Sequence, residues 1–116
     1  MDLEVTSRQQ SGATVVSAVG EVDVWTAERL RSVLHDAEAA GPQTLVVDLT
    51  EVGFLDSTGI GVLVGALRRQ REAGRQLLLV VSNTHVMKVL TITSLDKVFP
   101  ISTTLPEALA QVGSDS

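Results

Sequence analysis

The spacing of apolar residues changes along the chain, and each spacing predicts a different element. At the start, apolar residues 3 and 5 alternate with polar neighbours, which predicts a half-exposed edge strand. After the turn-like segment QQSGA, β-branched residues at 14–19 predict a second strand that Gly20 ends, so that the two strands form a hairpin. The nearly continuous apolar runs at 44–49 and 77–81 predict strands covered on both faces.

Other segments carry apolar residues at intervals of three and four, which is the spacing of one helix face. The predicted inner faces are Leu30, Val33, Leu34 and Ala37; Ile60, Leu63, Val64 and Leu67; Val86, Val89, Leu90 and Thr93; and Leu105, Ala108, Leu109 and Val112. We expect Gly41-Pro42 to end the first helix, and Gly74 to end the second, which begins near Thr58.

The carboxyl-terminal part completes an alternating pattern of strands and helices. A short strand is predicted at 98–101, and the last helix begins with a capping box formed by Thr104 and Glu107. The resulting order, ββαβαβαβα, is typical of an α/β fold with a mixed, mostly parallel sheet, helices packed on it and a hairpin at one edge. We expect a single domain over 1–116, in which 113–116 form a frayed tail.

Composition narrows the classes of partner. Of the 116 residues 44% are hydrophobic and only 3% aromatic, and the net charge is −5. A negative chain disfavours nucleic acid and anionic membrane surfaces as partners. The start MDLEVTSRQQ lacks the basic and apolar regions of a secretory signal, and the apolar runs are too short to span a bilayer. We therefore expect a cytoplasmic protein.

The segment FLDSTGIG at 54–61 carries the chain's most distinctive chemistry. Its glycines suggest a dinucleotide fingerprint, but they follow a connection of about eight residues after Leu49 and no acidic residue ends the run at 77–81. Helix packing is favoured over nucleotide binding as the interpretation of these glycines. For Gly59 and Gly61, close approach of a partner's backbone is an equal alternative to helix packing. The two histidines, His35 and His85, are far apart and no cysteine is present, so we expect no enzyme, no cofactor and no metal site.

Ser57 allows two interpretations. Serine, threonine and aspartate are the preferred caps of a helix amino terminus, so Ser57 suits an N-cap. However, Asp56, Ser57 and Thr58 together exceed what one helix needs, and none has Glu or Gln three residues later to complete a capping box. A hydroxyl displayed at the rim of the sheet for a partner is therefore an equal alternative.

Three segments resemble one known family. They are LVVDLTEVGFLDSTGIGVLVGALRRQREAG, VGEVDVWTAERLRSVL and THVMKVLTITSLDKVFPISTTLPEALA. Together they resemble bacterial anti-sigma factor antagonists, the single-domain members of the STAS superfamily, over nearly the whole chain. The chain departs from the family pattern at Ser94, where glycine is usual, and at Trp25, which is unusually bulky. Trp25 is a candidate to alter the choice of partner.

The resemblance implies a regulatory cycle. Ser57 would be the phosphoacceptor, and Asp23, Asp56, Thr58 and Gly59 would join it in binding the partner. That partner is both an anti-sigma factor and a serine/threonine kinase. The unphosphorylated form would bind it and free the sigma factor, phosphorylation would end the binding, and a PP2C-type phosphatase would restore it.

The sequence leaves two other functions and the oligomeric state open. One alternative is a STAS accessory subunit of a lipid- or anion-transport complex, against which the phosphoacceptor motif argues. The other is a small nucleotide-binding domain, which rests on the glycine spacing alone. We expect a monomer or a weak dimer, because an edge hairpin can pair two chains without requiring it.

Overall fold

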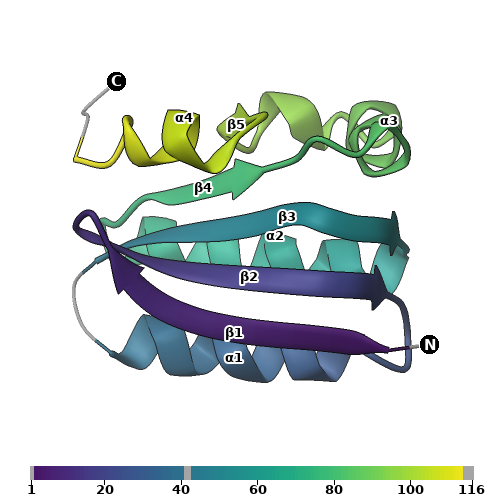
Figure 1. The fold of residues 1–116 in the computed structure, drawn as a ribbon, viewed down its shortest axis with the longest axis horizontal. Coiled ribbons are helices and arrows are strands. Elements are labelled where there is room, and N and C mark those ends of the chain that lie inside the picture. Colours follow the sequence, from purple (N-terminus) through teal and green to yellow (C-terminus); the bar gives the residue numbers. More distant parts are fainter. Residues whose placement is uncertain (1, 41–42, 114–116) are drawn as a thin grey trace.

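The computed structural model describes residues 2–40 and 43–113. The strands are β1 (Leu3–Gln10), β2 (Ala13–Val22), β3 (Thr44–Leu55), β4 (Leu77–Val80) and β5 (Ile101–Ser102). The helices are α1 (Ala27–Ala39), α2 (Ser57–Glu72), α3 (Thr84–Ile92) and α4 (Leu105–Leu109), with a 3-10 turn, η1 (Leu95–Lys97), after α3. The predicted order is confirmed (Figure 1). The predicted stop at Gly41-Pro42 lies outside the described residues.

The strands form one sheet in the order β1-β2-β3-β4-β5. β1 runs antiparallel to β2, and the other neighbours are parallel, so the predicted mixed sheet is confirmed. Ser11 and Gly12 form the hairpin turn with φ angles of 53° and 80°, a backbone that matches the twist of the two strands. Each parallel connection contains a helix, as a crossover between parallel strands requires.

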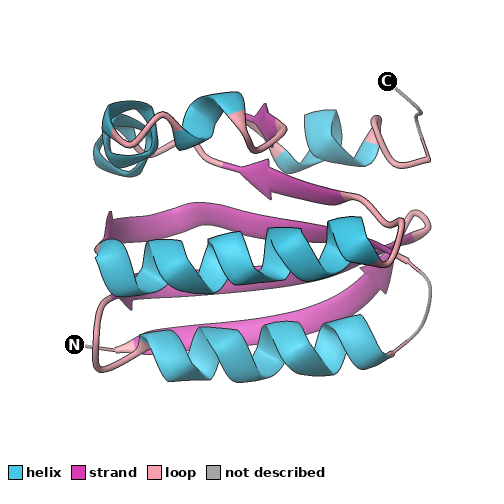
Figure 2. Ribbon diagram, turned by 180° about the vertical axis from the view of Figure 1, so that it is seen from behind, coloured by secondary structure: helices cyan, strands magenta, loops and turns pink. Residues whose placement is uncertain are grey.

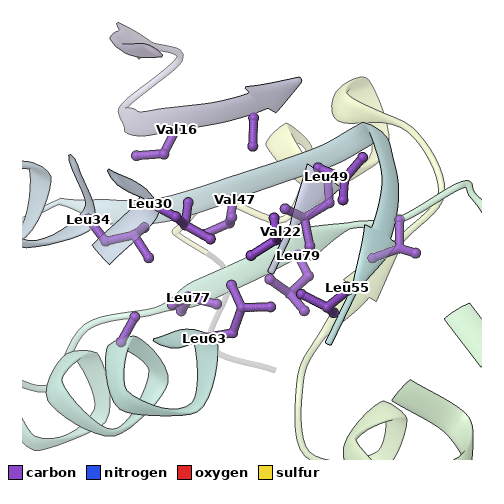
Figure 3. Packing of buried hydrophobic residues seen from close by; sticks show 14 of the residues in the cluster. Val16, Val22, Leu30, Leu34, Val47, Leu49, Leu55, Leu63, Leu77 and Leu79 are labelled. Atoms are coloured by element: carbon purple, nitrogen blue, oxygen red, sulfur yellow. The ribbon is translucent and has the colours of Figure 1, made fainter. Parts of the chain in front are cut away.

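Helices cover the two faces of the sheet unequally. α1 and α2 lie side by side on one face (Figure 2), where their leucines pack against the strands (Figure 3). On the other face, the short α4 covers a smaller cluster around Ala108. Alternate residues supply the two clusters: Val16, Val47 and Leu79 share one row and belong to the larger cluster, whereas Val15, Val46 and Leu78 share the next row and belong to the smaller.

β2 does not end at Gly20, as predicted, but continues to Val22. Gly20 has φ +128°, and a Cβ there would collide with the carbonyl oxygen of Asp2. The glycine thus marks an irregularity in the pairing with β3 and a close approach of the amino-terminal segment, rather than the end of the strand.

β3 is also longer than predicted, because two bulges hide its pattern. It continues past Leu49 to Leu55, and its pairing with β2 shifts twice. The extra residues break the alternation of apolar and polar positions, although Val52 and Leu55 are buried. Consequently only Asp56 separates β3 from α2, and the long connection inferred from the sequence is wrong.

The remaining boundary errors are small. α2 begins one residue earlier than predicted, at Ser57. β5 is Ile101–Ser102 instead of 98–101, because Val98 lies exposed in the turn after η1. α3 ends at Ile92, so Thr93 is exposed and does not belong to the inner face. The capping box of Thr104 and Glu107 is confirmed.

Candidate functional site

The ends of β2 and β3 bring two short turns together at the carboxyl edge of the sheet. Val22 and Leu55 are paired, and the amide of Asp56 donates to the carbonyl oxygen of Val22 at 3.1 Å. The turn after β2 begins with Asp23, and the turn after β3 is Asp56 alone. Both lie at the right-hand end of the sheet in Figure 1, where α2 begins. In parallel α/β sheets this edge is the usual position of binding sites.

Asp56 is the N-cap of α2. Its Oδ1 accepts hydrogen bonds from the amide of Thr58 at 2.9 Å and from that of Gly59 at 3.1 Å. Its backbone is extended, with φ −103° and ψ −176°, so the chain turns from strand into helix at this residue. The aspartate thereby satisfies two of the amides that a helix amino terminus leaves without a partner.

Ser57 is consequently free of the capping role. It is the first residue of α2, it is exposed, and its hydroxyl makes no hydrogen bond with any residue in 2–40 or 43–113. Of the two interpretations left open by the sequence, the structure favours display of the hydroxyl. The amino terminus of α2 also favours a negative charge at this position.

The two glycines that follow differ in their surroundings. A Cβ at Gly59 would lie 2.5 Å from Leu55 Cδ1 and 2.6 Å from Val22 Cγ1, so packing against the sheet requires a glycine there. At Gly61 a Cβ would meet no atom within 4 Å. Helix packing therefore accounts for Gly59 and fails to account for Gly61.

Gly61 instead lines a surface groove between the starts of α1 and α2. The groove has a volume of about 320 Å³. Its walls are Val24, Ala27, Glu28, Arg31, Thr58, Gly61 and Val62. The predicted site residue Thr58 is therefore exposed beside the groove, and a glycine at 61 keeps the groove open.

Asp23 organises the turn that forms the other side of the site. Its side chain is only 5% exposed, and Oδ1 accepts from the amides of Trp25 at 2.8 Å and Thr26 at 3.0 Å. The Thr26 hydroxyl donates to the carbonyl oxygen of Glu21 at 2.7 Å and closes the turn. Asp23 Oδ2 is buried without a partner among the described residues. The buried Asp23 side chain thus fixes the backbone of the exposed turn. Direct contact between Asp23 and a partner stays a prediction.

Comparison with known proteins identifies the family. The model of the STAS domain matches residues 4–108. The chain belongs to the STAS family. It is 31% identical over 101 residues to the anti-sigma-B factor antagonist of Listeria monocytogenes, covering 87% of this chain and 88% of that protein.

Solved structures agree with this assignment. An anti-sigma factor antagonist from Mycobacterium paratuberculosis superposes with a TM-score of 0.87 at 30% identity, over 96% of this chain and 94% of the other. SpoIIAA, a Bacillus cell fate determinant solved in its phosphorylated form, gives a TM-score of 0.70 at 21% identity, over 93% and 98% of the two chains. The likeness to SpoIIAA shows the STAS fold alone.

The glycines and histidines singled out in the sequence of this STAS chain lie as follows. Gly59, Gly61 and Gly65 lie inside α2, as predicted, although the turn before them is tight. His35 is exposed on α1, and the ring of His85 stacks on Phe54 with centroids 5.7 Å apart. Across 2–40 and 43–113, no three histidine or acidic side chains are grouped to hold a metal ion, and no helix is long and apolar enough to cross a membrane.

Sequence reasoning missed one feature of the site, the exposed apolar residue Val24. It is 63% exposed and lines the groove beside Thr58. A signal was present, because an aspartate readily bonds the backbone amide two residues on and so forms a tight turn, and turns lie at the surface. Without the hydrogen bonds of Asp23, Val24 continues the alternation of acidic and apolar residues at 21–24 and is expected to share the buried face of Val22.

Proposed function

We propose that this chain is an anti-sigma factor antagonist whose activity is switched at Ser57. In its unphosphorylated form it binds an anti-sigma factor that is also a serine/threonine kinase, and so frees the sigma factor. The kinase then phosphorylates Ser57 and binding ends, until a PP2C-type phosphatase removes the phosphate. The observation that carries the proposal is the exposed Ser57 hydroxyl, left without a partner in the described chain because Asp56 caps the helix. The names of the relatives support the same function.

In this cycle the chain is a substrate and not an enzyme, and it acts in the cytoplasm. The Ser57 oxygen attacks the γ-phosphorus of ATP, the bond from that phosphorus to the β,γ-bridging oxygen breaks, and ADP leaves. The hydroxyl proton needs a base. Since no acceptor in the described residues contacts the Ser57 hydroxyl, the kinase supplies that base together with ATP and its metal ion.

The phosphate leaves the fold almost unchanged. It adds a charge of about −1.5 to −2. The amino terminus of α2 stabilises an anion by roughly 0.3–1 kcal/mol. The Asp56 carboxylate opposes it by roughly 1 kcal/mol per charge at about 4 Å in water. For the added charge the repulsion amounts to roughly 1.5–2 kcal/mol, and the helix terminus offsets part of it, so we expect phosphorylation to lower the free energy of unfolding by at most about 2 kcal/mol.

The effect on a closed interface is larger. An uncompensated charge buried in a contact costs roughly 3–5 kcal/mol. At about 1.4 kcal/mol per tenfold change in affinity, the complex weakens by about two to three and a half decades. The phosphate therefore blocks the contact directly, and no change of fold is needed.

The test is to mix the chain with candidate anti-sigma kinases and Mg-ATP, and to locate the phosphate by mass spectrometry. We expect modification of Ser57 and none in Ser57→Ala, which should bind the kinase and stay bound. Ser57→Asp should weaken binding by about 100-fold or more. Ser32→Asp is the matched control, because it adds the same charge at an exposed position of α1. Phosphate on Thr58 instead, or full binding by Ser57→Asp, contradicts the proposal.

A further inference from the structure

Trp25 stands out as the most exposed large apolar side chain of the described residues. It is 86% exposed, and its neighbour Val24 is 63% exposed. Trp25 is also the only tryptophan in a sequence with 3% aromatic residues. Tryptophan is enriched at the centres of protein interfaces, where a single buried indole contributes much of the affinity. An indole held in solvent on a small domain is therefore a candidate anchor for a partner.

The backbone that carries Trp25 is already fixed. Its amide donates to Asp23 Oδ1 at 2.8 Å, and the amides of Thr26 and Ala27 donate to Asp23 Oδ1 and to the Asp23 carbonyl oxygen at 3.0 and 2.8 Å. α1 begins immediately afterwards. Binding through Trp25 would consequently lose little backbone entropy, which is the advantage of a pre-organised anchor.

The position of the turn identifies which partner would meet the indole. Val24 and Thr58 line the same groove, and Val22 and Leu55 hold the two turns side by side. A protein that closes over Ser57 therefore also covers the turn that presents Trp25. This continuity points to the same partner and not to a second one.

We infer that Trp25 is the hydrophobic anchor of this chain for its anti-sigma kinase and a determinant of which kinase it accepts. The inference rests on the proposed function and names the chemistry of the partner. The partner surface facing Ser57 has an apolar pocket that receives the indole, with a hydrogen-bond acceptor placed for the indole N–H. Kinases without that pocket meet a bulky side chain that prevents close approach, so one residue both attracts the cognate partner and excludes others.

The experiment measures binding of the kinase that phosphorylates Ser57, using unphosphorylated chain. Trp25→Ala should raise Kd by about 30-fold or more, the range of an interface hot spot, and Trp25→Phe should fall between Ala and the parent. Val98→Ala is the matched control. Val98 is exposed, but its carbonyl oxygen accepts from Arg71 in the last turn of α2, about 20 Å along the helix from Ser57. Its Kd should stay within about threefold of the parent.

Fluorescence gives a second, independent reading, because Trp25 is the only tryptophan of this chain and the emission of the kinase alone is subtracted. The emission maximum should shift to shorter wavelength when the kinase is added, and the shift should be absent with Ser57→Asp. Circular dichroism of Trp25→Ala checks that the fold is intact. Unchanged emission in a saturated complex, or near-parent affinity of Trp25→Ala, overturns the inference while leaving phosphorylation of Ser57 in place. If no anti-sigma kinase binds or modifies the parent, the proposed function itself fails and the inference fails with it.

Discussion

The two ends of α2 use polar side chains in opposite ways. At its carboxyl end, Gln70 is only 2% exposed, and its amide nitrogen donates to the carbonyl oxygen of Gln76 at 2.8 Å. Nearby, Arg69 forms a two-pronged contact with Glu38, with distances of 2.6 and 3.0 Å. The hydrogen bonds with Glu38 raise the pKa of Arg69 above its ordinary value. Gln70 and Arg69 are thus both matched with partners inside the chain.

At the amino end of α2, by contrast, groups suited to binding a partner are exposed. The Ser57 hydroxyl has no partner in the described residues, Trp25 is exposed, and Gly61 leaves a groove open beside Thr58. Asp56, however, caps the helix through the two hydrogen bonds that its Oδ1 accepts from the amides of Thr58 and Gly59. One end of the helix therefore stabilises the fold, whereas the other end presents groups without partners in the described chain.

The largest expected effect separates two glycines two residues apart in α2. Gly59→Val should destabilise the fold by about 3 kcal/mol, because its side chain would overlap Leu55 and Val22, and the closely packed sheet cannot yield. Gly61→Val should change the free energy of unfolding by less than about 0.5 kcal/mol, since the new atoms enter open space. Urea denaturation measures both values.

The affinity for the partner should also differ between the two glycine variants. Under the proposed function, Gly61→Val should weaken binding of the anti-sigma kinase because the side chain fills the groove beside Thr58. Equal destabilisation by both substitutions would show that α2 packs differently near its start. A Gly61→Val chain with parent affinity would remove the groove from the partner-binding surface.

The second prediction concerns the opposite end. Gln70→Met keeps the size of the side chain but removes the donor to the carbonyl oxygens of Gln76 and Gln43. The Gln76 oxygen still accepts from the Leu45 amide at 3.0 Å, so we expect a loss of about 1.5 kcal/mol. Gln111→Met at an exposed position is the control, with an expected change within about 0.5 kcal/mol. Urea denaturation gives the free energies, and kinase affinity should be unchanged in both variants. A loss of affinity in Gln70→Met would contradict the division of roles between the two ends.

Much of this arrangement could be predicted from sequence. The helix faces and the central strands are local patterns, so their order was predicted correctly, and Ser57 was placed at the edge of the sheet. The ends of β2 and β3 could not be predicted, because the bulges near Gly20 and after Asp48 depend on pairing between strands. Which of Asp56 and Ser57 caps α2 could not be predicted either. Both residue types are good N-caps, and only the backbone geometry decides between them.

The chain's departure from the family pattern at Ser94 gains a physical meaning from the structure. Ser94 has φ +61° and ψ 15°, the left-handed conformation, immediately before η1. The glycine usual at this position would adopt that backbone without strain. This departure therefore lowers stability without touching Ser57 or the groove, and it has no evident link to the choice of partner.

The smallest expected effect separates the cap from the charge at Asp56. Asp56→Ala removes the acceptor of the Thr58 and Gly59 amides and should cost about 1 kcal/mol of stability. Asp56→Asn keeps an acceptor of nearly equal capping strength and should stay within about 0.5 kcal/mol of the parent. Ser57→Ala should also be nearly neutral, because the hydroxyl holds nothing in the described chain. Thermal unfolding of the three variants measures this order.

Kinase affinity then decides what the Asp56 carboxylate does besides capping. If the partner contacts the negative charge, Asp56→Asn loses affinity at unchanged stability, whereas a purely structural Asp56 leaves the affinity of Asp56→Asn equal to that of the parent. Both results are compatible with Asp56 as the N-cap. That role is tested separately, by the difference in stability between Asp56→Ala and Asp56→Asn. A Ser57→Ala chain that is less stable than Asp56→Ala would show that the serine holds the helix start after all. The Ser57 hydroxyl would then have a structural role, and the proposed switch would lose the observation on which it depends.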